Sequence, residues 1–467
     1  MKLKFNLRKI ATQIGGRFTS SDGRELLSNA VSIDSRTLNR GDLFIPIKGT
    51  RYNGNDFIEE AISRGASGAV IDNLAVALKY PSCPMILVED NLNALQFIAS
   101  YRRESIKGLK VIAITGSVGK TTVKELVASI MSTKYSTIKS EGNLNNHIGL
   151  PLSLLKIDRD HKVAVVELGM NAKGEIKQLS KIATPDIAII TNVKHAHLSS
   201  LKSIEEIALA KSELIVELPA NKIALINHDD LHLKKTIAAR RRRGLVMTFG
   251  KNKQSDVVLL DSTVSSNGCS ILTIQYKKQI AKFASPLLGK HNDENVLAAV
   301  AVGLISKIPV AKIQRGINST KSVKGRMQHI KVASGIDIID DSYNANPASM
   351  EAALDFLATV GNYDQRIAVV GDMNELGKFT HRFHREVIKQ AALAGIDILV
   401  GVGELLELAI KSKSYARLQC KSVKSHKAAF NYIARKISSN SIILVKGSRA
   451  AKMEAVVGML ESKLGAN

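Results

Sequence analysis

Tryptophan is absent from this chain of 467 residues, and aromatic residues make up only 4% of it. Binders of single-stranded nucleic acids stack bases on aromatic side chains, so this composition disfavours such a role. The densest basic run, four arginines at residues 240–243, has no interleaved aromatic residue. We interpret it as the solvated end of a helix, with a nucleic-acid patch as the alternative. We expect no nucleic-acid partner.

Cysteine is also scarce. Cys83, Cys269 and Cys420 are odd in number, far apart and without the spacing of a metal site. This pattern excludes a disulfide scaffold and indicates a reducing compartment. The N-terminal residues lack the apolar run of a secretion signal, and no apolar run approaches the ~18 residues of a membrane helix. We therefore expect a cytoplasmic protein with no stable membrane insertion.

Acidic residues are outnumbered, and the formal net charge is +24. Residues 1–100 carry 12 Lys or Arg and 10 Asp or Glu, residues 101–320 carry 33 and 18, and residues 321–467 carry 21 and 14. The excess is therefore concentrated in the middle of the chain. It fits either a nucleic-acid enzyme or a site for small polyanionic substrates in a generally basic protein.

The length and the apolar pattern predict an α/β protein of three domains. Residues 1–100 form a small α/β domain with short strands. Residues 101–320 alternate helices with near-continuous apolar strands, which is typical of a parallel sheet covered on both faces, and an antiparallel extension is expected at about 251–285. Residues 321–467 are a second doubly wound, Rossmann-like α/β domain. No internal repeat or low-complexity linker is visible.

Residues 111–125 have the pattern of a phosphate-binding loop, a strand followed by Thr-Gly-Ser-Val-Gly-Lys-Thr-Thr and a helix that begins near Lys120. Glycines let the backbone approach an anion, and the first N–H groups of the helix face it. Lys120 would neutralise phosphates, and the Thr121 hydroxyl would hold Mg²⁺. Ile114 stands where the common G-x-x-x-x-G-K-[ST] pattern has its first glycine, so the loop is shorter than in GTPases. A plain glycine-rich turn is the alternative, which the Lys-Thr pair disfavours.

Polar residues follow the strands of the central domain. Glu167 ends the strand after the loop strand, so its carboxylate is predicted to join Thr121 on Mg²⁺; a surface glutamate is the alternative. His197 follows the next strand and could bind a metal or a phosphate, with His195 as its competitor. By composition alone, Lys211 is a surface lysine that snorkels from an apolar helix.

The helix at residues 291–305 and the third domain carry further polar candidates. Asn292 and Asn295 share one helical face and could frame an adenine, although Asn292 could instead cap the helix. Asp341 leaves a strand where carboxylates accept from ribose hydroxyls. Lys446 and Arg449 flank a glycine turn, an arrangement that suits the binding of carboxylates or phosphates. A cleft between the two α/β domains is the natural site.

The first domain has one polar turn, Asp34-Ser35-Arg36-Thr37. A simple turn with a local ion pair explains it as well as a functional role does. Ser and Thr hydroxyls beside an arginine also suit a diphosphate.

These pieces together resemble the Mur ligases, ATP-dependent amide-forming enzymes of peptidoglycan precursor synthesis. The resemblance covers essentially the whole chain, and the matching stretches are residues 34–36, 115–125, 142–152, 167–175, 196–198, 210–213, 289–295, 325–326, 341–347, 371–377 and 446–449. Tyr-Asn-Ala-Asn-Pro at 343–347 and Lys-Gly-Ser-Arg at 446–449 resemble the members that join D-alanyl-D-alanine to UDP-N-acetylmuramoyl-tripeptide. The tripeptide-forming Mur ligase and folylpolyglutamate synthase are the alternatives within the superfamily.

The resemblance implies ATP and two Mg²⁺ ions as cofactors. Thr121 and Glu167 would bind the first Mg²⁺; His197 and a carbamylated Lys211 would serve the second. With Lys120, Glu167, His197 and Lys211 form the implied catalytic set. The implied nucleotide contacts are Gly116, Ser117, Val118, Gly119, Lys120, Thr121 and Thr122 for phosphate, Asn292 and Asn295 for adenine, Arg326 for phosphate and Asp341 for ribose.

The resemblance also implies a substrate site and a mechanism. The implied substrate contacts are Asp34, Ser35, Arg36 and Thr37 at the UDP end, with Asn146, Tyr343, Asn344, Asn346, Lys446 and Arg449. The tripeptide carboxylate would attack ATP to give an acyl phosphate, which the amine of D-alanyl-D-alanine would then attack. Closure of the third domain would complete the site of a monomeric enzyme.

Two positions depart from the family pattern. Lys194 stands where relatives generally have a small residue, and Ser199 stands where an acidic residue or a glycine is frequent.

Two rivals of another class remain. The shortened loop disfavours a nucleotide switch or nucleic-acid ATPase, and Glu167 with residues 446–449 disfavours a non-catalytic nucleotide-binding module.

Overall fold

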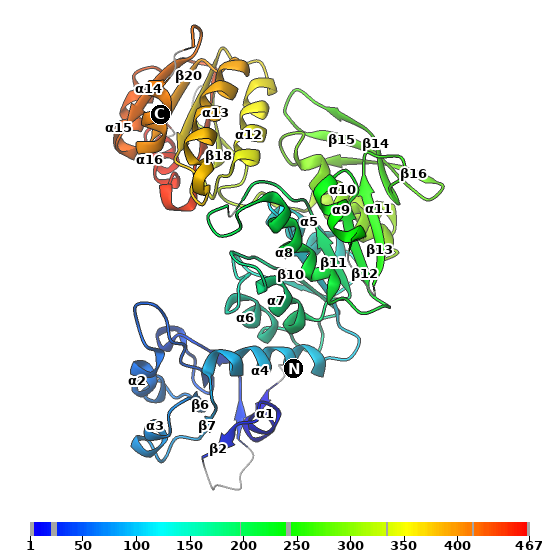
Figure 1. The fold of residues 1–467 in the computed structure, drawn as a ribbon, viewed down its shortest axis with the longest axis vertical. Coiled ribbons are helices and arrows are strands. Elements are labelled where there is room, and N and C mark those ends of the chain that lie inside the picture. Colours follow the sequence, from blue (N-terminus) through cyan, green and yellow to red (C-terminus); the bar gives the residue numbers. More distant parts are fainter. Residues whose placement is uncertain are drawn as a thin grey trace.

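The computed structural model describes residues 4–19, 26–196, 198–239, 244–332, 335–412 and 415–464. The chain folds into three units that follow one another along its long axis, with the N-terminal unit at one end and the C-terminal unit at the other (Figure 1). The arginine run at 240–243 and His197 lie outside the described residues. The α/β architecture with three units was predicted, and the boundaries near residues 100 and 320 stay predictions.

The N-terminal unit is a small mixed α/β unit. Its elements are β1 (Phe5–Asn6), α1 (Leu7–Gln13), β2 (Arg17–Phe18), β3 (Leu27–Ser28), β4 (Val31–Ser32), β5 (Leu43–Phe44), α2 (Ile58–Ser63), β6 (Gly68–Ile71), α3 (Leu74–Lys79) and β7 (Met85–Leu87). The described strands form one sheet in the order β2-β7-β6-β5-β4, with β1 and β3 paired beside it. Helix α4 (Asn91–Ser105) joins this unit to the central one and packs there against α6 and α7.

The central unit is built on one large sheet. Its strands are β8 (Lys110–Thr115), β9 (Thr137–Lys139), β10 (Val163–Glu167), β11 (Ile187–Ile190), β12 (Ile223–Asn227), β13 (Leu245–Gly250), β14 (Val257–Val264), β15 (Ser270–Tyr276) and β16 (Gln279–Ser285). Its helices are α5 (Lys120–Ser132), α6 (Gly149–Leu155), α7 (Glu175–Ala183), α8 (Ile204–Val216), α9 (Leu231–Ala238), α10 (Asn292–Ile305) and α11 (Val310–Asn318). The order is β16-β15-β14-β13-β12-β11-β8-β10-β9. Only the pairs β14–β15 and β15–β16 are antiparallel within this sheet of described strands, as the pattern at 251–285 predicts.

The apolar strands of this sheet are buried on both faces because alternate residues point to opposite sides. In β8, Val111 and Ala113 join the core beneath α6, α7 and α8, whereas Ile112 and Ile114 join the core beneath α5, α10 and α11. The helices therefore sandwich the sheet. This arrangement leaves the carboxyl ends of its parallel strands as the open edge, where ligands bind in α/β sheets.

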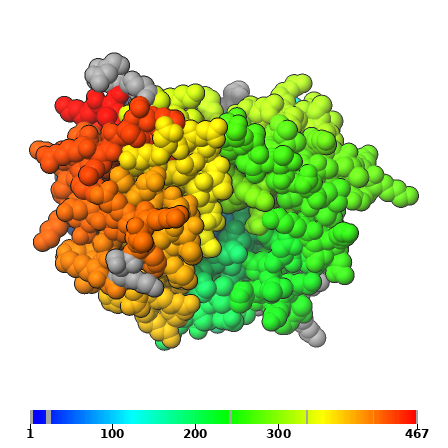
Figure 2. All heavy atoms as spheres, turned by 90° about the horizontal axis from the view of Figure 1, so that it is seen from above, coloured from blue at the N-terminus to red at the C-terminus, as the bar shows by residue number. Residues whose placement is uncertain are grey.

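The C-terminal unit is a second doubly wound sheet. Its elements are β17 (Gln328–Lys331), β18 (Ile336–Asp341), α12 (Pro347–Thr359), β19 (Gln365–Gly371), α13 (Thr380–Leu393), β20 (Ile398–Val402), α14 (Glu404–Ser412), β21 (Gln419–Val423), α15 (His426–Ala434), β22 (Ser441–Lys446) and α16 (Glu454–Leu464). The order is β17-β18-β22-β19-β20-β21, parallel except for β17. Seen from above, this unit and the central one leave a hollow between them (Figure 2). In the described ranges, no helix is both long and apolar enough to cross a membrane.

Candidate active site

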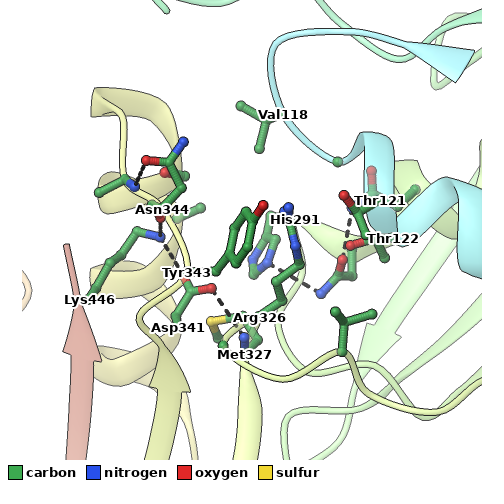
Figure 3. A pocket seen from close by; sticks show the side chains of 18 of the residues that line it. Val118, Thr121, Thr122, His291, Arg326, Met327, Asp341, Tyr343, Asn344 and Lys446 are labelled. Atoms are coloured by element: carbon green, nitrogen blue, oxygen red, sulfur yellow. Dashed lines mark hydrogen bonds and ion pairs between the residues drawn. The ribbon is translucent and has the colours of Figure 1, made fainter. Parts of the chain in front are cut away.

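A cavity of about 1390 Å³ lies between the central and C-terminal units. Most of the predicted site residues line it, namely Ser117, Val118, Gly119, Lys120, Thr121, Thr122, Asn146, Glu167, Lys211, Asn292, Asn295, Arg326, Asp341, Tyr343, Asn344, Asn346, Lys446 and Arg449. Figure 3 shows the phosphate loop on one side of the cavity and the strand-end loops of the C-terminal unit on the other. Elements more than 200 residues apart in the chain thus meet at one site.

The phosphate loop is shaped by its glycines. Gly119 has a φ of +83°, and a Cβ there would lie 2.1 Å from Asn295 Oδ1. A Cβ on Gly116 would lie 1.9 Å from Thr191 Oγ1. Only glycine fits either place, so the loop can lie against β11 and α10. The Lys120 ammonium donates a hydrogen bond to Gly116 O at 2.8 Å, which folds its side chain back over the loop.

The residues after β11 brace this loop. Asn192 accepts from the Val118 N–H at 3.0 Å, and the Ser117 hydroxyl donates to Lys194 O at 3.0 Å. The Lys194 N–H donates in turn to the Ser117 hydroxyl oxygen at 3.0 Å. The phosphate loop and the chain after β11 are therefore one bonded unit. No sequence signal pointed to this role for Asn192 and Lys194, because their partners lie more than 70 residues away.

Glu167 is buried and is bonded to the start of α5, the helix that follows the phosphate loop. Its Oε2 accepts from the Thr121 hydroxyl at 2.8 Å, and its Oε1 accepts from the Asn145 amide at 2.9 Å. The alternative of a surface glutamate is wrong, because only 3% of the residue is exposed. Hydroxyl, carboxylate and amide oxygens are the donors that Mg²⁺ prefers, so the residues present fit a Mg²⁺ site. Asn145 was not predicted; it lies in the chain next to Asn146, and only the fold brings it to β10.

Lys211 is buried, with 1% of the residue exposed, so the interpretation from composition as a surface lysine is wrong. It lies on α8 and reaches the cavity. Among the described residues its amine has no hydrogen-bond or ion-pair partner. Burial lowers the pKa of Lys211 well below its ordinary value, and the positive charge of Lys120 lowers this pKa further. Both effects favour the uncharged amine, which is the form that acts as a nucleophile.

In the described part of the chain, no three His, Cys, Asp or Glu side chains converge as a metal centre. A cation beside Glu167 would therefore take its remaining ligands from hydroxyl, substrate or water oxygens. His197, the other predicted ligand of the second cation, lies outside the described residues.

Helix α10 brings two amides to the loop. The Asn295 amide donates to Asn292 Oδ1 at 2.8 Å, and the Asn292 amide donates to Leu288 O at 2.7 Å. His291 is the N-cap residue of this helix and makes no side-chain cap bond. The alternative of Asn292 as a helix cap is therefore wrong. Both asparagines line the cavity as a connected pair, with Asn295 against Gly119.

The C-terminal wall of the cavity carries an aromatic ring with two arginines beside it. The Arg326 guanidinium lies 4.4 Å from the centre of the Tyr343 ring, and that of Arg449 lies 5.6 Å from it. Below the ring, the Lys446 ammonium pairs with Asp341 at 2.5 Å and donates to Asn344 O at 3.1 Å (Figure 3). The charge of Lys446 is therefore balanced by Asp341, and its side chain is held in place by its neighbours. Its motif alone suggests instead a lysine that is free to bind an anion.

Two predicted asparagines have local structural tasks as well. Asn346 caps α12 by accepting from the Ser349 N–H at 2.9 Å. Asn146 accepts from the Gly149 N–H at 2.8 Å, at the start of α6. Their amide oxygens are thus occupied. Both asparagines also line the cavity, which places the two helix starts beside it, and helix N-termini favour anions.

 The polar turn of the N-terminal unit lies apart from this cavity. Asp34 accepts from the Arg36 guanidinium at 2.9 and 2.7 Å, and Ser35 donates to Glu60 at 2.7 Å. The local ion pair is therefore present. Asp34, Ser35, Arg36 and Thr37 do not line the cavity. Of the predicted phosphate-loop contacts, Gly116 does not line it either. A role for this turn at the UDP end stays a prediction.

Comparison with known proteins gives one consistent result. Residues 28–103 match the Mur ligase family catalytic domain, residues 114–303 the Mur ligase middle domain, and residues 325–449 the Mur ligase glutamate ligase domain. The UDP-N-acetylmuramoyl-tripeptide--D-alanyl-D-alanine ligase of Bacillus subtilis is 34% identical, over 99% of this chain and all of that protein. The ligase of the same name from Escherichia coli is 35% identical, over 94% of this chain and 95% of that protein.

Solved structures agree with this result. A crystal structure of MurF from Acinetobacter baumannii has a TM-score of 0.89 at 29% identity, covering 99% of this chain and 100% of that one. MurF from Thermotoga maritima in complex with ADP has a TM-score of 0.82 at 28% identity, covering 93% and 97%. The chain belongs to the Mur ligase family.

Proposed function

We propose that this chain is an ATP-dependent ligase that joins D-alanyl-D-alanine to the terminal carboxylate of UDP-N-acetylmuramoyl-tripeptide. The observation that carries the proposal is the single cavity that unites Lys120 and Glu167 of the central unit with Tyr343 and Arg449 of the C-terminal unit. The full-length similarity to ligases of that name supports the choice of substrates. The products would be UDP-N-acetylmuramoyl-pentapeptide, ADP and phosphate, so the chain would serve peptidoglycan synthesis and hence cell shape and division.

The proposed ATP site is the phosphate loop. Lys120 and the first N–H groups of α5 would bind the β- and γ-phosphates, because a helix N-terminus and an ammonium both favour anions. The paired amides of Asn292 and Asn295 would contact adenine beside the loop. Arg326 would reach phosphate from the C-terminal unit, and Asp341 would accept from a ribose hydroxyl. The ADP complex of a similar protein supports nucleotide binding by this chain.

Thr121 and Glu167 would hold the first Mg²⁺. When bound, Mg²⁺ neutralises charge on phosphate oxygens and holds them in line for attack. Thr121 and Glu167 already share a hydrogen bond of 2.8 Å, so little rearrangement would bring both oxygens to one cation. Asn145 fixes the other carboxylate oxygen and keeps the group oriented.

Lys211 would be carbamylated. Its uncharged Nζ would form a bond to the carbon of CO₂ and lose a proton to solvent, which leaves a carbamate in place of an amine. The carbamate carries two oxygens and a negative charge, and it would serve the second Mg²⁺ with His197. The buried amine without a partner among the described residues supports this proposal, because burial favours the uncharged amine that can attack CO₂ and a cation would pair the charge of the carbamate.

The reaction would run in two displacements. A carboxylate oxygen of the tripeptide would attack the γ-phosphorus of ATP and release ADP, forming an acyl phosphate. The amine of D-alanyl-D-alanine would then attack the acyl carbon, lose a proton and release phosphate. The residues of the chain position the groups and neutralise charge, which is what phosphoryl transfer requires. No side chain needs to act as a nucleophile.

The proposed substrate spans two units. Asp34, Ser35, Arg36 and Thr37 would bind the UDP end in the N-terminal unit. The peptide end would lie in the cavity, where Asn146, Tyr343, Asn344 and Asn346 offer polar contacts. Arg449 would bind a carboxylate, with Lys446 holding the wall in place. We further propose a monomer that works in the cytoplasm with no nucleic-acid partner.

An amine screen with a phosphate readout tests this proposal. The protein is incubated with Mg²⁺, ATP and UDP-N-acetylmuramoyl-tripeptide, and candidate amines are added one at a time. Phosphate release that depends on D-alanyl-D-alanine, with the pentapeptide product seen by mass spectrometry, is expected. Parallel reactions test diaminopimelate or lysine with the UDP-linked dipeptide, and glutamate with a folate. Turnover only in one of these would instead assign the chain to a tripeptide-forming or folylpolyglutamate ligase.

A further inference from the structure

The turn at residues 371–377, which follows β19, matches the family pattern, and its residues 374–376 line the cavity without an assigned task. Its base is fixed within the C-terminal unit. The Met373 N–H donates to His384 Nε2 at 2.9 Å, and Asp372 Oδ1 accepts from the Leu406 N–H at 2.9 Å. Because its base is fixed in this way, the turn moves together with the C-terminal unit, and the position of that unit determines where the tip of the turn lies.

The tip of this turn contacts the central unit. The Ser199 N–H donates to Glu375 O at 3.1 Å, a backbone hydrogen bond between the two units. Gly377 has a φ of +53°, and a Cβ there would lie 3.0 Å from Leu198 O. Glu375 is also left-handed, with a φ of +61°. Because few side chains adopt this conformation, the turn depends on glycine at 377 to approach the central unit closely.

Two rings on the C-terminal side support the same contact. The Phe383 ring of α13 lies 5.5 Å from the His195 ring, and Phe379 lies 6.1 Å from Phe383. Both phenylalanines pack against the core cluster that contains Leu198. The chain after β11 is thus contacted by a backbone hydrogen bond at one residue and by aromatic rings at others.

The same stretch of chain is bonded to the phosphate loop at its other end. Asn192 accepts from the Val118 N–H, and Lys194 bonds the Ser117 hydroxyl through both its N–H and its carbonyl. Residues 192–199, of which residue 197 lies outside the described residues, therefore bridge the phosphate loop and the turn of the C-terminal unit. We call this stretch the bridge.

We propose that the turn at residues 371–377, together with Phe383, positions the phosphate loop through the bridge. Docking of the C-terminal unit then sets the geometry of the loop. Gly377 and Phe383 act as positioning residues, because neither lines the cavity and both contact the bridge. Glu375 lines the cavity and bonds the bridge through its backbone carbonyl. The consequence for turnover rests on the proposed function, whereas the mechanical coupling can be tested without any substrate.

Two glycine variants of the full-length chain separate the contact from simple backbone strain. Gly377→Ala places a Cβ against the bridge, whereas Gly395→Ala introduces the same kind of strain, at a φ of +68°, with nothing within 4 Å. Hydrogen exchange is measured at the Ser199 and Val118 amides. The Gly361 amide, which donates to Ser266 O at 2.9 Å in a second contact between the units, is the internal reference.

We expect Gly377→Ala to speed exchange at Ser199 and Val118 by about tenfold, with Gly361 and the Gly395→Ala protein unchanged. In the amine assay it should lower kcat by on the order of ten- to a hundredfold while the KM for ATP stays within about threefold. Phe383→Ala should likewise speed exchange and lower kcat. Phe383→Tyr keeps the aromatic ring, so its exchange rates and its kcat should stay close to those of the wild type.

Equal exchange at Val118 in the two glycine variants would overturn the proposal, as would faster exchange with an unchanged kcat. Faster exchange at Gly361 together with Ser199 would also overturn it, because the whole interface would then have opened. If the wild-type chain joins no D-alanyl-D-alanine, the proposed function fails. In that case the exchange rate of the Val118 amide still tests whether the C-terminal unit is mechanically coupled to the phosphate loop.

Discussion

At the scale of single residues, two lysines face one cavity with opposite surroundings, Lys120 half-buried and Lys211 buried. Lys120 donates to Gly116 O, and the carboxylate of Glu167 lies near enough to oppose the effect of burial on the pKa of Lys120. Lys211 has neither kind of support among the described residues, and the charge of Lys120 adds to the effect of burial on its pKa. Burial and the charge of Arg326 lower the pKa of Lys120, but Glu167 supports its charged form, the one that binds phosphate. For Lys211 both effects favour the uncharged amine.

Replacing Lys120 with alanine should lower the tripeptide-dependent release of ADP by about two to three orders of magnitude, because a positively charged group beside the transferred phosphate is lost. The release rate is measured with a coupled ADP assay, and circular dichroism checks the fold. Lys134→Ala, an exposed lysine just after α5, is the control and should keep full activity. Near-normal turnover of Lys120→Ala would contradict the proposed ATP site.

Lys211→Ala should lose most activity and regain part of it when short carboxylates such as formate or acetate are added. The physical reason is that a small carboxylate can occupy the space and supply the charge of the proposed carbamate. Activity is measured with increasing carboxylate, with the Lys120→Ala protein as a control that should show no rescue. Wild-type activity that survives complete removal of CO₂ and bicarbonate would argue for an unmodified amine instead.

At the scale of elements, helix α13 holds the turn at residues 371–377 through a neutral histidine. His384 Nε2 accepts from the Met373 N–H, and its Nδ1 donates to Thr380 O at 2.7 Å. Asp372 lies 4.0 Å from His384 Nε2, but the ring cannot donate there while it accepts from Met373. Burial lowers the pKa of His384, although the Thr380 carbonyl and Asp372 act in the opposite direction.

This geometry predicts how stability depends on pH. The unfolded chain binds a proton at His384 below about pH 6.5, whereas the folded chain does not until a lower pH, so acid favours the unfolded state. Between pH 7.5 and 5.5 the wild-type protein should therefore lose more stability than His384→Gln, by at most about 1.4 kcal/mol per pH unit. Thermal unfolding midpoints give the comparison. His381→Gln, exposed on the same helix, should follow the wild type.

At the scale of the whole molecule, the positive charge is not gathered at the site. Among the described residues that line the cavity, eight are Lys or Arg and nine are Asp or Glu. The formal charge of +24 therefore resides mostly elsewhere on the chain. The idea that the basic central segment by itself suits anionic substrates is thus too simple, because the acids of the cavity offset its cations. Bound cations would be needed to make the site attractive to ATP.

Removal of Mg²⁺ should therefore weaken equilibrium binding of ATP by on the order of tenfold or more, since the Glu167 carboxylate would then face phosphate without a cation between them. Binding is measured by calorimetry with Mg²⁺ and with EDTA. Glu167→Gln removes the charge at nearly constant size, so the difference between the two conditions should shrink in that variant. Equal ATP affinity with and without Mg²⁺ in the wild type would contradict this account.

Much of the fold could be predicted because its signals are local. The antiparallel extension at about 251–285 and the helix at residues 291–305 follow from apolar runs and periodicity, and the structure has β14 to β16 and α10 there. The phosphate loop was visible in eight consecutive residues. The burial of Lys211 was not visible, since its helix is apolar on several sides and composition does not say which side faces the protein interior.

The sequence by itself determined the alternation of strands and helices, the phosphate loop and the candidate polar residues at strand ends, because each depends on neighbours in the chain. The tertiary structure decided which of these residues meet. The Lys446–Asp341 pair, the Glu167–Asn145 bond and the Ser199–Glu375 bond between units join residues 22 to 176 positions apart. Such partners are set by how sheets and units pack, and no local pattern encodes that packing.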